Sequence, residues 1–172
     1  MAGLKNTNRI IGGIVGDIVG SVYEFDNIKS KDFVLFGDHH GQKCFATDDS
    51  IMTLAVCDAF TKSAPYYEFL YENLMKSMQE IGRPYPDCGY GGRFYSWMYS
   101  DNPQPYNSFG NGAAMRVSAA AYAANTLSEA LDFARITAEV THNHPEGIKG
   151  AVATTGCIFL DRKSTRLNSS HG

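Results

Sequence analysis

Apolar side chains recur at three- and four-residue intervals along most of this 172-residue chain, and this periodicity constrains the fold more than any other feature. Such spacing is typical of helices that bury one face. The clearest example is the run Ile10, Ile11, Ile14, Val15, Ile18, Val19 and Val22. Further helices are expected from Thr47 to Phe60 and over residues 67–79, 93–99, 113–124, 128–140 and 145–160. Only residues 33–36 resemble a strand, so we expect an all-α protein, built as an orthogonal multi-helix bundle.

Residue types at the expected helix starts support these boundaries. Thr47 and Ser128 are good N-cap residues, and Pro145 suits a first helical turn. The first helix is unusual because it carries Gly12, Gly13, Gly16 and Gly20. Each glycine costs a helix about 1 kcal/mol relative to alanine. We therefore expect this helix to pack its backbone closely against another element.

Composition excludes several classes of protein. Apolar residues make up 44% and charged residues 19%, which is inconsistent with intrinsic disorder. A formal charge of −3 argues against binding to nucleic-acid phosphates, and no apolar run reaches the ~18–20 residues that span a bilayer. Four cysteines at positions 44, 57, 88 and 157 form no Cys-x-x-Cys pair. We expect reduced thiols in a cytoplasmic protein without nucleic-acid or membrane partners.

The last twelve residues differ from the rest of the chain. Residues 161–172 contain one leucine, three basic residues and no apolar periodicity. One interpretation is a solvated C-terminal tail. The other is a non-native extension that resembles a translated sequencing adaptor, in which case residues 1–160 are the native part. Both interpretations predict a segment without core contacts.

Two carboxylates lie at the end of the glycine-rich helix. Asp17 and Glu24 are seven residues apart, so a continuous helix would direct them to nearly the same side. They could form part of a site. Alternatively, Asp17 caps a neighbouring loop and Glu24 is a solvated terminus.

Two further carboxylates follow the N-cap residue Thr47. Asp48 and Asp49 would complement the dipole of a helix that starts there. Capping explains one of them, whereas the second adds repulsion unless a cation is present. A threonine hydroxyl and two carboxylates are also ligands that a hard divalent cation prefers.

A glycine-rich turn precedes the alanine-rich segment, in the run Ser108, Phe109, Gly110, Asn111, Gly112. Backbone N–H groups at such a turn can bind an anion, although Asn-Gly is above all a turn signal. The segment from Thr141 to Glu146 contains His142 and His144. This pair could ligate a transition metal, but it is more typical of polar turn chemistry.

Taken together and in this order, the motifs resemble the ADP-ribosylglycohydrolase family. The matching stretches are 12–24, 47–52, 108–116 and 141–151, and the resemblance extends over residues 8–160. It implies an all-α hydrolase that removes ADP-ribose from a modified protein or small molecule. The bond cleaved would be an N- or O-glycosidic bond.

The resemblance also implies roles for individual residues. Thr47, Asp48 and Asp49 would hold part of a binuclear Mg²⁺ or Mn²⁺ centre, with Glu24 and Asp49 as catalytic residues. The ADP-ribose contacts would come from Ser108, Gly110, Asn111, Gly112 and His142.

The family pattern includes a C-terminal Asp-x-Asp-Thr/Ser motif that is absent after Leu160. The resemblance therefore implies that the chain corresponds to the first half to two-thirds of a family member and is inactive by itself. A non-catalytic ADP-ribose-binding or structural homologue is the alternative. Retention of the four acidic and hydroxyl residues favours the enzyme.

Overall fold

The computed structural model describes the backbone of residues 4–169 and the side chains of residues 10–164. The chain is all-α, as the periodicity predicts. The helices are α1 (Leu4–Gly20), α2 (Asp48–Ser63), α3 (Leu70–Gly82), α4 (Gly92–Met98), α5 (Gly112–Met115), α6 (Ser118–Ala123), α7 (Leu127–Glu139) and α8 (Pro145–Ser169). A 3₁₀ turn, η1 (Ser21–Tyr23), follows α1, and β1 (Asp38–His39) pairs with β2 (Gln42–Lys43) in a hairpin.

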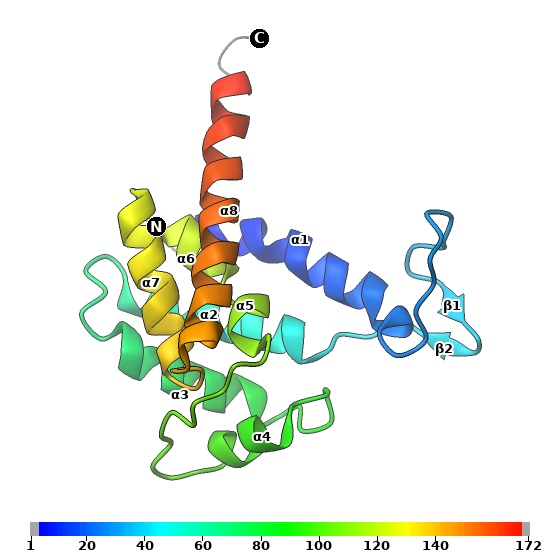
Figure 1. The fold of residues 1–172 in the computed structure, drawn as a ribbon, viewed down its shortest axis with the longest axis horizontal. Coiled ribbons are helices and arrows are strands. Elements are labelled where there is room, and N and C mark those ends of the chain that lie inside the picture. Colours follow the sequence, from blue (N-terminus) through cyan, green and yellow to red (C-terminus); the bar gives the residue numbers. More distant parts are fainter. Residues whose placement is uncertain (1–3, 170–172) are drawn as a thin grey trace.

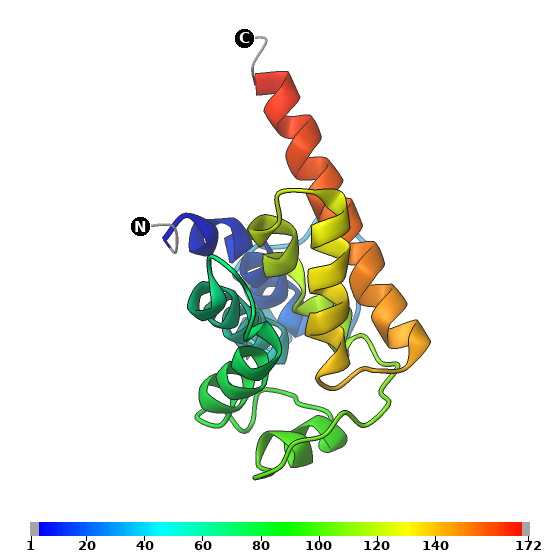
Figure 2. The same cartoon turned by 90° about the vertical axis from the view of Figure 1, so that its left-hand side faces the viewer.

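Helix α2 is the centre of the packing. It contacts α1, α3, α5 and α6, while α7 and α8 lie side by side in both views (Figures 1 and 2). The helices run in several directions rather than as one parallel bundle. Helix α2 buries Met52, Ala55, Val56 and Ala59 completely, so side chains enclose it on several sides. Among the described residues, no helix is long and apolar enough to cross a membrane.

The N-cap residue predicted from the sequence is confirmed for α2 but is wrong for α7. Thr47 is the N-cap of α2, and its hydroxyl accepts a hydrogen bond from the Asp49 N–H at 3.2 Å. The N-cap of α7 is Thr126 rather than Ser128. The Thr126 hydroxyl accepts from the Glu129 N–H, and the Glu129 carboxylate accepts from the Asn125 N–H. This exchange resembles a capping box, which requires the acidic residue three positions after the cap.

Two other predicted elements differ from the structure. The expected helix over residues 113–124 is divided into α5 and α6, and Arg116 turns into the core at the division, where it is 1% exposed. Residues 33–36 form no strand, and Phe36 has a positive φ of 53°. The strands flank His40 and Gly41 instead, because both residues adopt the positive φ that a two-residue hairpin turn requires.

The glycine-rich face of α1 is open, contrary to the close packing we expected. A Cβ atom added to Gly12, Gly13, Gly16 or Gly20 would meet no atom within 4 Å. Of the predicted apolar face, Ile10, Val19 and Val22 are buried, whereas Ile11 and Val15 are exposed.

Helix α8 continues through Ser169 and extends beyond the other helices (Figures 1 and 2). The sequence contains no glycine or proline between Gly156 and Ser169 that would end it. We expected residues 161–172 to make no core contacts, and Arg162, which is half-buried, makes polar contacts with the body of the chain. Its guanidinium donates to the carbonyl oxygens of Tyr122 and Ala124 at 3.0 and 2.9 Å. The side chains of residues 165–169 and all of residues 170–172 lie outside the described residues, and a non-native origin of the tail stays a prediction.

Candidate functional site

Asp17 holds the end of α1 against the start of α2. Its carboxylate accepts hydrogen bonds from the backbone N–H groups of Thr47 and Ser50 at 2.9 and 3.2 Å. It also accepts from the hydroxyls of the same two residues. Four donors on a single carboxylate fix the position of the first turn of α2. Asp17 thus caps a neighbouring segment, which is one of the two roles that the sequence suggested.

The remaining acidic residues gather around this anchor. Glu24, Thr47 and Asp49 line a cavity of about 400 Å³ together with Asp17 and Asn111. Glu24 is exposed, whereas Thr47 is buried and Asp49 is half-buried.

The electrostatics of this cluster are unfavourable in the absence of a cation. Burial, followed by the charges of Asp49, Glu24 and Asp17, raises the pKa of Asp48 to about 6. Burial followed by the charges of Asp17 and Glu24 also raises the pKa of Asp49. Among the described side chains, none of these four carboxylates forms an ion pair with a basic residue. The cluster has excess negative charge that a bound cation would neutralise.

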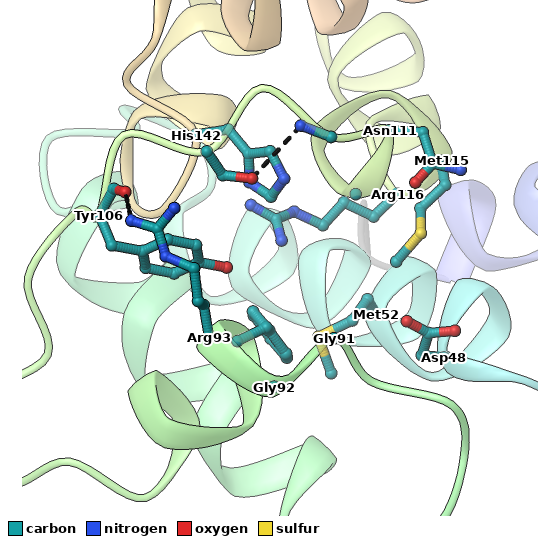
Figure 3. A pocket seen from close by; sticks show the side chains of 14 residues that line it. Asp48, Met52, Gly91, Gly92, Arg93, Tyr106, Asn111, Met115, Arg116 and His142 are labelled. Carbon is teal, nitrogen blue, oxygen red and sulfur yellow. Dashed lines mark hydrogen bonds between the residues drawn. The ribbon is translucent and has the colours of Figure 1, made fainter.

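A second cavity, of about 300 Å³, adjoins the first (Figure 3). Asp48 lies at one end of it and His142 at the other, while Asn111 borders both cavities. Its remaining walls come from α2, α4 and α5 and from the loop segments beside them: Met52, Gly91, Gly92, Arg93, Phe94, Tyr106, Ser108, Gly110, Gly112, Met115 and Arg116. The volume is at the lower end of the range for small-molecule sites.

The glycine-rich loop is held against the start of α8. The Asn107 N–H donates to the side-chain oxygen of Asn143 at 2.7 Å, and the Ser108 hydroxyl accepts from the Gly110 N–H at 3.3 Å. A Cβ atom at Gly147 would lie 2.6 Å from the Ser108 carbonyl oxygen, so only glycine permits this approach. The helix that follows the loop, α5, has only four residues. Its dipole is correspondingly small, and the loop offers an anion its backbone N–H groups rather than a long helix terminus.

His142 is buried and lies in a hydrogen-bonded chain with Thr141 and Arg116. The Arg116 guanidinium donates to the Thr141 hydroxyl oxygen at 2.7 Å, and this oxygen lies 2.7 Å from His142 Nδ1. A hydroxyl that accepts from Arg116 can still donate its own proton to Nδ1, and in that arrangement the proton of the imidazole is on Nε2. Burial and the Arg116 charge lower the pKa of His142 to about 4. The neutral ring faces Gly112, whose added Cβ would lie 3.1 Å from Nε2.

His144 does not join His142 in a metal site. Its ring packs against Phe109 with centroids 5.4 Å apart, and its Nδ1 accepts from the Glu146 N–H at 3.1 Å. Both contacts are typical of a polar turn that leads into a helix.

The sequence patterns did not identify three residues that line the second cavity, which are Arg93, Tyr106 and Arg116. Arg93 lies over the Tyr106 ring, 4.8 Å from its centroid, and donates to the Tyr106 carbonyl oxygen. Arg116 is the only charged residue among the most deeply buried side chains in the described part of the chain. Burial lowers its pKa to about 10. The aromatic and basic residues between 90 and 106 carry no motif, so only the tertiary structure identifies them.

The all-α fold agrees with the family that comparisons with known sequences identify. The chain belongs to the ADP-ribosylglycohydrolase family, whose sequence model matches residues 7–164.

Among its relatives is the ADP-ribosylhydrolase ARH3 of Xenopus tropicalis, which is 27% identical over 167 residues, covering 83% of this chain and 46% of the relative. The proteins of the same name from Mus musculus and Homo sapiens are each 27% identical over 177 residues, covering 88% of this chain and 47% and 48% of the relatives. The chain spans about half the length of these curated relatives.

Proposed function

We propose that this chain forms part of a metal-dependent hydrolase that releases ADP-ribose from a modified protein or small molecule. The observation that carries the proposal is the gathering of Asp17, Glu24, Asp48 and Asp49 beside a glycine-rich loop, with Asn111 shared by the two cavities. Family membership supports the same activity, and the printed names of the relatives describe ADP-ribosylhydrolases.

The acidic and hydroxyl side chains at the end of α1 and the start of α2 fit Mg²⁺ or Mn²⁺. The donor set consists of carboxylate and hydroxyl oxygens, which hard divalent cations prefer. Thr47, Asp48 and Asp49 would hold the ions of a binuclear centre, and Asp17 would position them by fixing the first turn of α2. When bound, the cations would orient the ribose and activate a water molecule.

The second cavity suits the ADP part of the substrate. Backbone N–H groups of Asn111 and Gly112 would bind the diphosphate, with Ser108 and Gly110 beside them. Arg93 adds a positive charge at the same wall. His142 would donate a hydrogen bond from Nε2 in the tautomer in which the Thr141 hydroxyl donates to Nδ1.

Glu24 and Asp49 are the proposed catalytic residues. Hydrolysis at the anomeric carbon passes through an oxocarbenium-like state that carboxylates can stabilise. Glu24 is exposed at the cavity, so it can approach a substrate and exchange its proton with water. Asp49 is half-buried beside Asp17 and is less free to move.

We expect the 172-residue chain to be inactive by itself. Thr47, Asp48, Asp49 and Glu24 supply only part of the ~6 oxygen ligands that Mg²⁺ requires. Water can complete the coordination, but it supplies neither negative charge nor rigidity to hold two cations close together.

Release of ADP-ribose from modified proteins tests the proposal. The chain and a form extended to the length of the relatives are assayed with Mg²⁺, with Mn²⁺ and with a chelator. We expect metal-dependent release by the extended form alone, and its loss in Asp48→Ala and Asp49→Ala with an unchanged circular dichroism spectrum. Binding of ADP-ribose without release by the extended form would indicate the non-catalytic homologue. Release by the 172-residue chain alone would show that the catalytic centre has been misplaced.

A further inference from the structure

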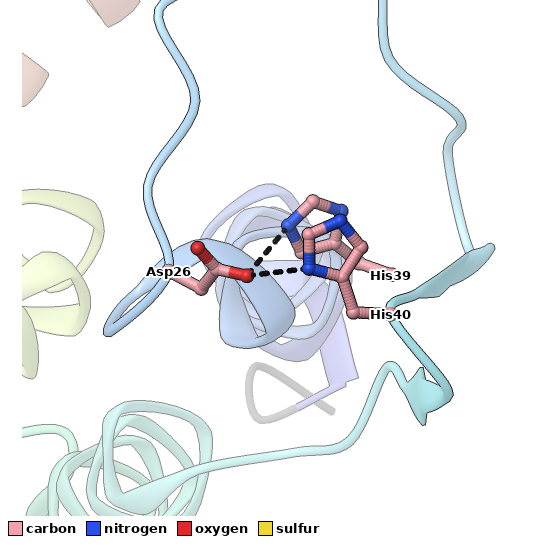
Figure 4. A group of neighbouring side chains, drawn as sticks. All are labelled: Asp26, His39 and His40. Carbon is pink, nitrogen blue, oxygen red and sulfur yellow. Dashed lines mark ion pairs between the residues drawn. The ribbon is translucent and has the colours of Figure 1, made fainter.

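Three ligating side chains meet outside the site described above, where the β1–β2 hairpin folds back on the end of α1 (Figure 4). The Asp26 carboxylate lies 3.2 Å from His39 Nε2 and 3.0 Å from His40 Nδ1, through the same oxygen. From this convergence we propose that Asp26, His39 and His40 bind a transition-metal ion of the Zn²⁺ class. The proposal is independent of the proposed hydrolase activity.

The backbone of the hairpin brings the two histidines together. Consecutive residues of a strand direct their side chains to opposite faces, so adjacent histidines would normally diverge. His40 and Gly41 form the turn with φ of 52° and 86°, and the Asp38 carboxylate accepts from the Gly41 N–H at 2.7 Å. The left-handed conformation of His40 places its ring beside that of His39, with centroids 4.2 Å apart.

The chemistry of the donors suits a tetrahedral ion, and their two separations from the Asp26 oxygen are near the value that such an ion requires. Ligands about 2.0 Å from a Zn²⁺ ion in a tetrahedral site are about 3.3 Å from one another. The observed separations of 3.0 and 3.2 Å are close to this value. Two imidazole nitrogens and one carboxylate oxygen favour Zn²⁺ and similar ions, whereas Mg²⁺ prefers oxygen alone. This site therefore differs in its metal class from the carboxylate cluster around Asp17.

Binding requires the movement of one ring. The two imidazole planes are 16° from parallel, and an ion cannot lie in both planes at once. His40 is free to turn because its side chain is 79% exposed, and His39 stays in place because it is 16% exposed and packs on the Tyr23 ring at 4.7 Å. Water would occupy the fourth position, as in zinc sites with three protein ligands.

An ion at this position would join two parts of the chain. Asp26 follows the η1 turn, and the histidines belong to the hairpin, which contacts η1. Metal binding would thus fix the segment between Glu24 and the hairpin, because a ligated ion would add a direct link to the ion pairs and to the packing of His39 on Tyr23.

The test is titration of the 172-residue chain with Co²⁺, whose visible absorption reports tetrahedral ligation, followed by displacement with Zn²⁺. Excess Mg²⁺ is present throughout to occupy sites that contain only oxygen ligands. We expect one equivalent of Co²⁺ to bind and to be displaced by Zn²⁺. Both Asp26→Asn and His40→Asn should weaken binding at least about tenfold, since even loss of an outer-shell partner has effects of this size.

His144→Asn is the matched control, because it removes a histidine that lies outside the cluster and should leave the affinity unchanged. Because the His40 side chain is exposed, we expect His40→Asn to keep the fold intact. Equal affinities of the wild type, Asp26→Asn and His40→Asn would overturn the proposal. So would the near-ultraviolet band of a Co²⁺–thiolate bond, which would place the ion on cysteines such as Cys44 or Cys88 instead.

Discussion

Asp17 anchors the start of α2 through hydrogen bonds from Thr47 and Ser50. The sequence singles out this residue because it lies seven positions before Glu24, but spacing alone does not separate an anchoring role from a ligating one. The hydrogen bonds to Thr47 and Ser50 depend on the approach of α1 to α2, which no local pattern encodes.

Replacement of Asp17 should reduce stability. Asp17→Ala leaves buried donors of Thr47 and Ser50 without an acceptor, and the expected loss in free energy of unfolding is about 1–3 kcal/mol. Glu24→Ala also removes one carboxylate from the cluster, but its effect should stay within about 0.5 kcal/mol because the residue is exposed. Urea unfolding of both variants measures the difference. Equal losses would show that Asp17 is not an anchor.

His142 should make stability depend on pH. Its pKa is about 4 in the folded chain against an ordinary value of 6.5, so the unfolded chain takes up a proton first as the pH falls. The stabilising contribution is complete above pH 6.5 and is lost progressively toward pH 4. Urea unfolding across this window should show a steeper loss for the wild type than for His142→Asn. Parallel curves for the two proteins would contradict a depressed pKa.

At the level of elements, sequence patterns locate most helices but not their packing. Periodicity and capping place α2 correctly because Thr47 satisfies a local rule. The division between α5 and α6 is not encoded locally, since an alanine-rich segment favours a continuous helix and the buried hydrogen bonds of Arg116 decide otherwise. The hairpin was missed because its strands have only two residues each.

Alanine substitutions at Gly12 and Gly147 should change the stability of the chain in opposite directions. Gly12 lies in an open helical position, so Gly12→Ala should stabilise this chain by up to about 1 kcal/mol. Gly147→Ala should destabilise it, because the added methyl group would meet the Ser108 carbonyl oxygen. Thermal unfolding of both variants measures these changes in stability. Stabilisation by Gly147→Ala would show that the loop and α8 are not in close contact.

At the scale of the whole molecule, the candidate site joins segments that are far apart in the sequence. The acidic residues come from the end of α1 and the start of α2, whereas the loop and His142 come from residues 108–142. Motif order and spacing predicted these residues as a set. They did not predict that Asp48 and Asp49 border different cavities, which follows from the helical rotation between consecutive residues.

We propose that the carboxylate cluster and the glycine-rich loop form one site for a divalent cation and ADP-ribose. Ligands that contact each other in one site show reciprocal coupling of their affinities. Calorimetric titration of the chain with ADP-ribose, at zero and at millimolar Mg²⁺, measures this coupling directly. We expect tighter binding with Mg²⁺ and no such gain in Asp49→Asn, a variant that should still bind ADP-ribose through the loop. An ADP-ribose affinity that is the same with and without Mg²⁺ in the wild type would contradict a shared site.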